Sequence, residues 1–401
     1  MSCIEPGTVG ILPVGALGAA FYFHLTRELA DVSGKVVFLP RRGSTNRTQM
    51  RTGAVLRIAA ATGLREFPIE QICRPGLIEC ARSGRLPELL LVCTQPDQLL
   101  AVISEYVELI EYLTVVMGLD AALRDLPPLI LSSNGIYHQR VRRFLVEALE
   151  ESMLYGRLPD LWSGAMGRIV GKLLRGVTIQ TGQREGQGQM AIYRPGPSGV
   201  TRLGGGDPAN RRRCGEVLQS LGGRFEVSED ETPTRIEFDK GLVNLCGNLL
   251  GQLKAIDEMG KVRLLTVGEI FPGPESPETR ELATHVIAVG RAVQAYRAEE
   301  DFETLYRSMM VVARGPMRHV PSSIQWIVLQ LRAGTLEARL SPTETWLLDP
   351  LIRYARTAGL NEAASYFAEL IRRVTERLQL AISANAAHGI ESIAPGDRIS
   401  T

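Results

Sequence analysis

The sequence has few of the residues that build metal centres or disulfide frameworks. Among its 401 residues there are six cysteines and five histidines. The cysteines lack short paired spacings and stand at Cys3, Cys73, Cys80, Cys93, Cys214 and Cys246. This scatter predicts free thiols in a reducing compartment, with neither a disulfide framework nor a metal site. We therefore expect a cytoplasmic protein.

The sequence also lacks an excess of one charge and an apolar segment long enough to span a membrane. The formal net charge is +1, hydrophobic residues make up 45% of the chain and charged residues 22%. Such a balance offers no electrostatic reason to bind nucleic acid or an anionic membrane. The apolar stretch 7–20 has no basic segment before it and no small-residue cleavage site after it, so we expect no signal peptide and no membrane span. The composition is that of a globular protein.

The first half of the chain alternates apolar strands with helices, which predicts a parallel sheet covered on both faces. The strands expected there are 8–12, 35–39, 89–93 and 129–132, the first followed by a helix over 14–29. Helical stretches are expected between the later strands, and segments 107–126 and 151–166 resemble insertions. Further strands are expected at 168–180, 189–194, 200–203 and 224–227, and these could extend the first sheet. Asp207 and Pro208 predict the start of a helix over 207–221.

After residue 233 almost everything has a helical pattern. The helices expected are 236–253, 277–297, 302–312, 323–332, 343–357 and 361–378. The sequence therefore predicts an α/β Rossmann-like domain with a parallel sheet over 1–233 and an all-helical domain over 234–401. The tail after residue 381 is small and polar, and we expect it to be poorly ordered.

The first strand leads into a turn typical of dinucleotide-binding proteins. The fingerprint G-x-G-x-x-G has its second and third glycines at Gly15 and Gly18, whereas Pro13 replaces the first. Gly15 would let the backbone approach a pyrophosphate, and Gly18 would let the helix pack on the strand. Ala16 and Leu17 complete the turn. An ordinary strand-to-helix turn is the alternative.

Residues that follow the second, third and fourth expected strands indicate which cofactor could bind. Arg41 and Arg42 follow the second strand where an NAD-binding protein would have an acid, so they favour NADP(H), although a solvated basic loop is the alternative. Thr94, Gln95 and Asn134 follow the third and fourth strands. Ligands of open α/β sheets bind beyond these carboxyl ends, so all three could meet cofactor or substrate. Asn134 could equally be a helix cap or a turn residue.

The most informative pattern lies in the helical half. Lys240, Asn244 and Asn248 stand four residues apart in an otherwise apolar run, so they stack on one face of a helix. Burying such groups without partners costs a few kcal/mol each, which a sequence tolerates for a ligand or an internal network. A solvated stripe on an amphipathic helix is the alternative.

Together these residues resemble the ketopantoate reductase family (2-dehydropantoate 2-reductases) over most of the chain. The specific parts are the Lys-x-x-x-Asn-x-x-x-Asn helix at Lys240 and the pair Ser322-Ser323, followed by Pro342-Thr343-Glu344. The glycine turn, Arg41-Arg42-Gly43 and Asn134-Gly135 also match. The resemblance implies a helical domain like that of 6-phosphogluconate dehydrogenase and an NADPH-dependent reduction of a 2-keto acid to a 2-hydroxy acid.

The same resemblance assigns roles to the site residues. Lys240 would protonate the forming alkoxide, which agrees with the charge that hydride addition creates on the carbonyl oxygen. Asn244, Asn248 and Ser323 would hold the carboxylate and hydroxyl of the substrate. Glu344 would orient the substrate or the lysine, with Glu337 as a rival. Asn134 would lie between cofactor and substrate.

The chain departs from the family at several positions, which keeps other functions open. Phe238 stands where the family has tryptophan, Thr94-Gln95 where it often has lysine, and two expected asparagines are missing. One alternative is another hydroxy acid, opine or sugar-phosphate dehydrogenase. Another is a non-catalytic sensor that binds NADP(H). A homodimer is compatible with the apolar stretches 282–293 and 324–331, which could also be core.

Overall fold

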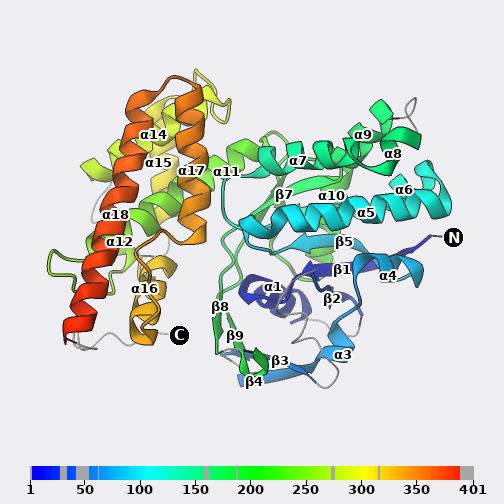
Figure 1. The fold of residues 1–401 in the computed structure, drawn as a ribbon, viewed down its shortest axis with the longest axis horizontal. Helices are drawn as coiled ribbons and strands as arrows, with labels where there is room; N and C mark the ends of the chain where they lie inside the picture. The colour runs from blue at the N-terminus through cyan, green and yellow to red at the C-terminus, as the bar shows by residue number, and fades with distance from the viewer. Residues whose placement is uncertain are drawn as a thin grey trace. The chain divides into compact units, whose positions relative to one another are not determined.

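The computed structural model of this chain divides into two compact units, Met1–Pro233 and Thr234–Thr401 (Figure 1). It describes residues 2–27, 34–41, 54–61, 63–157, 162–186, 188–271, 276–314 and 317–388.

A seven-stranded sheet forms the centre of the first unit, which confirms the predicted α/β, Rossmann-like architecture (Figure 1). In spatial order its strands are β11 (Phe225–Val227), β10 (Thr201–Gly204), β7 (Leu173–Thr178), β6 (Leu129–Leu131), β5 (Leu86–Val92), β1 (Ile4–Leu12) and β2 (Val36–Phe38). Neighbours from β2 to β7 are parallel, because helical crossovers connect them. The pair β7 and β10 is antiparallel, so the sheet is mixed rather than wholly parallel.

Helices cover both faces of this sheet, with α5 and α7 on one face and α1 on the other (Figure 1). The helical elements are α1 (Ala16–Thr26), α3 (Ile69–Ile72), α4 (Leu77–Arg82), η1 (Pro96–Gln98), α5 (Leu99–Met117), α6 (Leu119–Asp125), α7 (His138–Glu150), α8 (Met153–Arg157), α9 (Trp162–Val170), η3 (Gly188–Met190) and α10 (Pro208–Ser220).

Two predictions about the elements of the first unit were wrong. Segment 107–126 is no insertion, because its apolar positions continue α5 and α6. The strand expected from 168 begins at Leu173, since α9 runs to Val170. The expected cap of α10 is confirmed: the Asp207 side chain accepts hydrogen bonds from the first-turn N–H groups.

A second, four-stranded sheet was missed by the sequence analysis. Its order is β4 (Gly63–Pro68), β3 (Val55–Ala60), β9 (Ile192–Pro195) and β8 (Gly182–Glu185), so the strand expected over 189–194 belongs here and not to the first sheet. This sheet packs against α1. The rings of Phe67 and Tyr22 meet edge to face at 5.3 Å, and a Cβ on Gly182 would lie 2.3 Å from the Ala16 carbonyl oxygen. The start of α1 is therefore held between the two sheets.

The second unit is helical, as predicted. Its elements are α11 (Pro233–Asn244), the π-helical segment η4 (Leu245–Leu249), α12 (Leu250–Ala255), α13 (Val267–Ile270), α14 (Pro277–Ala292), α15 (Phe302–Arg314), α16 (Ser322–Ala333), α17 (Pro342–Thr357) and α18 (Asn361–His388). The expectation of a poorly ordered tail from 381 was wrong up to His388: α18 continues because Leu378 and Ala381 are fully buried. Of the helices in the described part of the chain, none has the length and apolarity needed to cross a bilayer.

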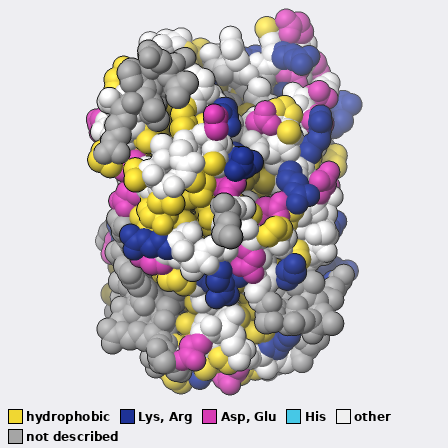
Figure 2. All heavy atoms as spheres, turned by 90° about the vertical axis from the view of Figure 1, so that its right-hand side faces the viewer, with side chains coloured by type: hydrophobic (Ala, Val, Ile, Leu, Met, Phe, Trp, Pro, Cys, Tyr) yellow, Lys and Arg dark blue, Asp and Glu magenta, His cyan; other side chains and the backbone are white. Residues whose placement is uncertain are grey.

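Charged side chains are finely mixed on the face shown in Figure 2. Lysine and arginine alternate there with aspartate and glutamate, and no large block of one sign is visible. Electrostatic selectivity on this face must therefore come from individual loops and cavities rather than from a broad field.

Candidate functional site

The glycine turn has the geometry that a dinucleotide requires at its second and third glycines. Gly15 is the N-cap of α1 with an extended backbone, and a Cβ added there would meet nothing within 4 Å. A Cβ on Gly18 would lie 2.6 Å from the Pro13 carbonyl oxygen and 3.1 Å from Ile11, so only glycine fits between helix and strand. Ala16 and Leu17 begin α1, where backbone N–H groups have no partner within the helix.

The loops after β2 and β5 lie at the same carboxyl edge of the sheet. Thr94 is 1% exposed, and its Oγ1 has no hydrogen-bond partner among the described residues. Gln95 is exposed and directly precedes η1. Arg41 is half-buried, and its Nε has no partner within the described ranges. Arg42 lies outside those ranges, so only one of the two predicted arginines can be placed.

Asn134 lies in the loop that joins β6 to α7. It is half-buried, and Tyr137 rather than Asn134 is the N-cap of α7. Gly135 has φ +134°, a conformation that favours glycine, so the loop turns sharply directly after Asn134. Asn134 is therefore a loop residue at the carboxyl edge and not a helix cap.

Arg175 fixes the backbone of this loop, and the sequence analysis missed it. Its guanidinium group is 1% exposed and donates hydrogen bonds to the carbonyl oxygens of Leu131 at 2.5 Å, Gly176 at 3.0 Å, Ser133 at 2.7 Å and Gly135 at 3.2 Å. Charge-assisted bonds of this kind hold a loop more firmly than neutral ones. The feature that could have revealed its role is the presence of a charged residue inside a six-residue strand whose positions are all buried.

Stacking strengthens the same arrangement. The Arg175 guanidinium lies 4.5 Å from the centre of the Tyr137 ring, and the Tyr137 hydroxyl donates a 2.7 Å hydrogen bond to the Ser133 carbonyl oxygen. Both ends of the Asn134 loop are thus tied to β7 and α7. These contacts form without any ligand.

The helix that carries Lys240 changes its winding between the predicted polar residues. Lys240 and Asn244 lie on α11, whereas Asn248 lies in the π segment. A π turn holds an additional residue, so it shifts Asn248 around the helix axis, and such turns are frequent at functional sites. Asn244 is 7% exposed, and its Nδ2 has no hydrogen-bond partner among the described residues.

Lys240 differs from an ordinary surface lysine. Its side chain keeps some contact with solvent, but burial of the ammonium group lowers its pKa from 10.5 to about 8. Desolvation disfavours the charged form, which is the physical cause of this shift. A solvated stripe would show neither this shift nor the burial of Asn244.

Ser323 and Asn248 are joined directly. The Ser323 hydroxyl, near the start of α16, lies 3.3 Å from the Asn248 side-chain oxygen and 3.2 Å from its backbone oxygen. It is 6% exposed. The structure thus brings together two predicted substrate-binding residues that are 75 positions apart in sequence.

Glu344 lies in the first turn of α17, which also packs against the π segment. It is 2% exposed, and its Oε2 has no hydrogen-bond partner among the residues that the structure describes. Burial raises the pKa of this carboxyl from 4.5 to about 7. Its rival Glu337 is exposed and forms an ion pair with Arg339 at 2.5 Å.

The polar groups of the second unit can therefore do specific chemistry. Lys240, Asn244 and Ser323 are hydrogen-bond donors, and Glu344 can exchange a proton near neutral pH. A buried polar atom without a partner costs about 1–3 kcal/mol, and both Asn244 and Glu344 carry one. Residues of these types can hold an anionic or carbonyl compound and deliver a proton to it, and among the predicted substrate-binding residues the structure joins Asn248 and Ser323 directly.

Comparison with known proteins identifies the fold. No family model matches the sequence, and no curated protein matches it significantly. Among solved structures, D-mandelate dehydrogenase with NADH and anilino(oxo)acetate is 15% identical with a TM-score of 0.60, covering 93% of this chain and 99% of that one.

Ketopantoate reductases give similar values. The 2-dehydropantoate 2-reductase of Porphyromonas gingivalis is 14% identical with a TM-score of 0.55, and the dimeric ketopantoate reductase of Staphylococcus aureus is 15% identical with a TM-score of 0.51. Each match covers 92% of this chain and 99% of the other. The family resemblance found in the sequence is confirmed at the level of the fold: the chain has the fold of the ketopantoate reductases.

Proposed function

We propose that this protein is a nicotinamide-dinucleotide-dependent reductase that converts a 2-keto acid to a 2-hydroxy acid. The observation that carries the proposal is the buried polar set of the second unit. Its lysine has a pKa of about 8, and its amide Asn244 and carboxyl Glu344 each have an unpartnered atom. Support also comes from the fold, since the D-mandelate dehydrogenase structure contains NADH and an oxo acid derivative.

The first unit has the residues to hold the cofactor, which supplies the hydride when bound. The open space at Gly15 and the unpartnered hydroxyl of Thr94 fit a pyrophosphate-containing ligand at this edge. Gly15, Ala16, Leu17 and Gly18 would face the pyrophosphate, and Thr94, Gln95 and Asn134 the remainder. Arg41, with Arg42, would favour NADPH over NADH by pairing with the 2′-phosphate.

Lys240 would be the proton donor. Reduction of a keto group places negative charge on its oxygen, and an ammonium at that oxygen stabilises the charge and completes the hydroxyl. A pKa near 8 keeps Lys240 mainly protonated at neutral pH, yet lets it release the proton more readily than an ordinary lysine. Asn244, Asn248 and Ser323 would hold the carboxylate and hydroxyl of the substrate.

Glu344 would orient the substrate or the lysine. Its burial and its titration near neutral pH favour it over the exposed Glu337, whose carboxylate already pairs with Arg339. Buried carboxyls with a raised pKa occur frequently at active sites.

The proposal is tested by a panel of 2-keto acids with NADPH and NADH, followed at the absorbance of the reduced cofactor. We expect at least one acid to be reduced, faster with NADPH. Binding of NADPH without turnover on any carbonyl compound would favour a sensor. Turnover confined to other carbonyl classes would instead favour a different dehydrogenase. A homodimer is a separate proposal, tested by size-exclusion chromatography with light scattering.

A further inference from the structure

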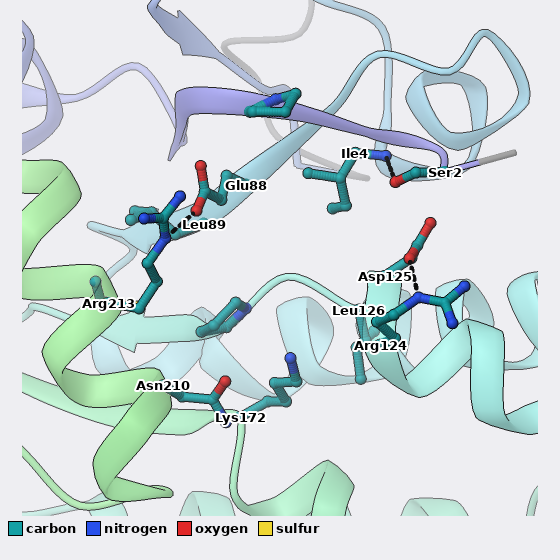
Figure 3. A pocket seen from close by; sticks show the side chains of 13 residues that line it. Ser2, Ile4, Glu88, Leu89, Arg124, Asp125, Leu126, Lys172, Asn210 and Arg213 are labelled. Carbon is teal, nitrogen blue, oxygen red and sulfur yellow. Dashed lines mark hydrogen bonds and ion pairs between the residues drawn. The ribbon is translucent and has the colours of Figure 1, made fainter.

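A cavity lies in the first unit, away from the edge proposed for the cofactor. It has a volume of about 430 Å³, within the range of small-molecule sites. Ile4 begins β1, Glu88 lies near the start of β5, Pro128 precedes β6 and Lys172 precedes β7, so the cavity opens at the amino ends of the strands (Figure 3). The glycine turn lies at the opposite, carboxyl edge.

Both carboxylates of this cavity already have partners. Glu88 accepts hydrogen bonds from Arg213 Nε at 2.7 Å and from the Gly7 N–H at 2.6 Å. Asp125 accepts from Arg124 Nε at 3.3 Å and from the Cys3 N–H at 3.0 Å. These contacts bind each acid directly to an arginine and a backbone N–H group, and neither acid forms an ion pair with a further cation of the lining.

Lys172 is that further cation. It forms no hydrogen bond or ion pair with its side chain to another described residue, and its ammonium points into the space between the Arg213–Glu88 and Arg124–Asp125 pairs (Figure 3). The lining holds three cationic side chains and two anionic ones, so it has an excess of one positive charge, and Asp125 and the nearby Asp207 act on Lys172 only at a distance, without an ion pair. Partial burial lowers the pKa of Lys172 below its ordinary value. An anion at this point would relieve both effects.

The position of Lys172 is well defined by its backbone. Its carbonyl oxygen accepts the Leu129 N–H at 2.8 Å, and its N–H donates to Ile169 at 2.9 Å. From the facing helix α10, Arg213 and Asn210 lie three residues apart on one face, and Asn210 Nδ2 is held by the Gly171 carbonyl oxygen at 3.3 Å. The site is thus assembled from rigid elements.

The remaining wall is apolar and formed by Ile4, Leu89, Leu126 and Pro128. A ligand that fits must therefore combine one negative charge with a compact apolar body. We propose that this cavity binds a small organic carboxylate, with the carboxylate on Lys172 and the body against the apolar wall. The site is independent of the proposed reductase activity.

The test uses benzoate, with benzamide as its neutral isostere, on the full chain without cofactor. Affinity is measured by ligand-observed NMR titration. We expect benzoate to bind with a dissociation constant on the order of 1 mM and at least about tenfold more tightly than benzamide, since one charge-assisted hydrogen bond contributes that much. Lys172→Met should lose this preference, whereas Lys172→Arg, which keeps the charge, should retain most of it.

Two controls separate this site from others. Lys261→Met removes an exposed lysine of the second unit, and Lys240→Met removes the cation of the proposed substrate site. Both should leave the preference for benzoate intact. Should Lys172→Met fail to fold, the side-chain NMR signals of Lys172 in the wild type, assigned through Lys172→Arg, must still shift with benzoate. Equal binding of benzoate and benzamide, unchanged binding in Lys172→Met, or no binding of benzoate would overturn the proposal.

Discussion

Two sets of buried polar groups, one in each unit of this molecule, make different contacts. In the first unit, the buried cation Arg175 donates to four backbone carbonyl oxygens and stacks on Tyr137, so it serves the fold. In the second unit, Asn244 and Glu344 are equally buried but each keeps an atom without a partner among the described residues. Native proteins pair nearly all such atoms, and a ligand is one way to satisfy the exceptions, which include Thr94 in the first unit.

Because of this difference, we expect substitutions in the two sets to change different properties of the protein. Substitution of Arg175 should mainly lower stability. Changes in the polar set of the second unit should mainly lower turnover, and can even raise stability, because functional groups are often kept at a cost to the fold.

The largest effect is expected at Lys240. Lys240→Ala removes the proposed proton donor and should lower kcat for 2-keto acid reduction by roughly 10²–10⁴. The matched control Lys261→Ala removes an exposed lysine of the same unit and should leave kcat unchanged. Steady-state assays at saturating NADPH decide the outcome, and an unchanged rate in Lys240→Ala would remove this residue from the mechanism.

Substitution of Arg175 is expected to lower stability, in contrast to the loss of turnover expected at Lys240. Arg175→Met leaves four buried carbonyl oxygens without their charged donor and should lower the free energy of unfolding by about 3–5 kcal/mol. Arg194→Met, which removes a partly exposed arginine paired with Glu185, should change it by less than about 1 kcal/mol. Urea denaturation measures both. A loss at Arg175 no larger than the loss at Arg194 would break the comparison between the two units.

Glu344 should show that a group proposed for the active site can destabilise its own fold. Its pKa rises from 4.5 to about 7 on folding, so the folded state binds the proton more tightly and loses stability as pH rises through this window. Glu344→Gln should therefore raise the free energy of unfolding at pH 9 by about 2–3 kcal/mol, with little change at pH 4. Denaturation at the two pH values tests this. A variant less stable than the wild type at pH 9 would show that the carboxylate is paired.

The glycine turn gives the smallest effect and separates binding from folding. Gly15→Ala adds a methyl group that meets nothing within 4 Å, so stability should change by less than about 0.5 kcal/mol. The affinity for NADPH should fall by about tenfold or more, because the backbone must approach the pyrophosphate at this glycine. Fluorescence titration with NADPH measures this change. Unchanged NADPH affinity in Gly15→Ala would exclude this turn as the cofactor site.

Gly18→Ala should instead lower stability by about 1–3 kcal/mol through overpacking against Pro13.

Strong periodicity made much of the fold predictable. The apolar strands of the first sheet and most helices after residue 233 carry clear patterns and were expected within a few residues of their places, whereas α13 was not expected. The hairpin of β3 and β4 was not expected either, because β4 is mostly exposed and has no apolar face. The end of α18 was missed because small residues such as Ala381 suggest a loose tail, although this one is fully buried.

The candidate site was predictable only where one helix carries it. Spacing placed Lys240 and Asn244 together, but the π segment depends on tertiary packing that no local pattern reveals. The contact between Ser323 and Asn248 joins separate helices and came from family resemblance rather than from the residues themselves. Arg175 was overlooked because its partners are backbone carbonyl groups, which leave no trace in the side-chain pattern.

The pH dependence of kcat/KM for reduction of the best 2-keto acid tests the central claim most directly. If the Lys240 ammonium supplies the proton, kcat/KM must fall as pH rises through about 8, the pKa of that group in the free protein. The remaining activity of Lys240→Ala should lack this decline. A decline near pH 8 that persists unchanged in Lys240→Ala would contradict the account.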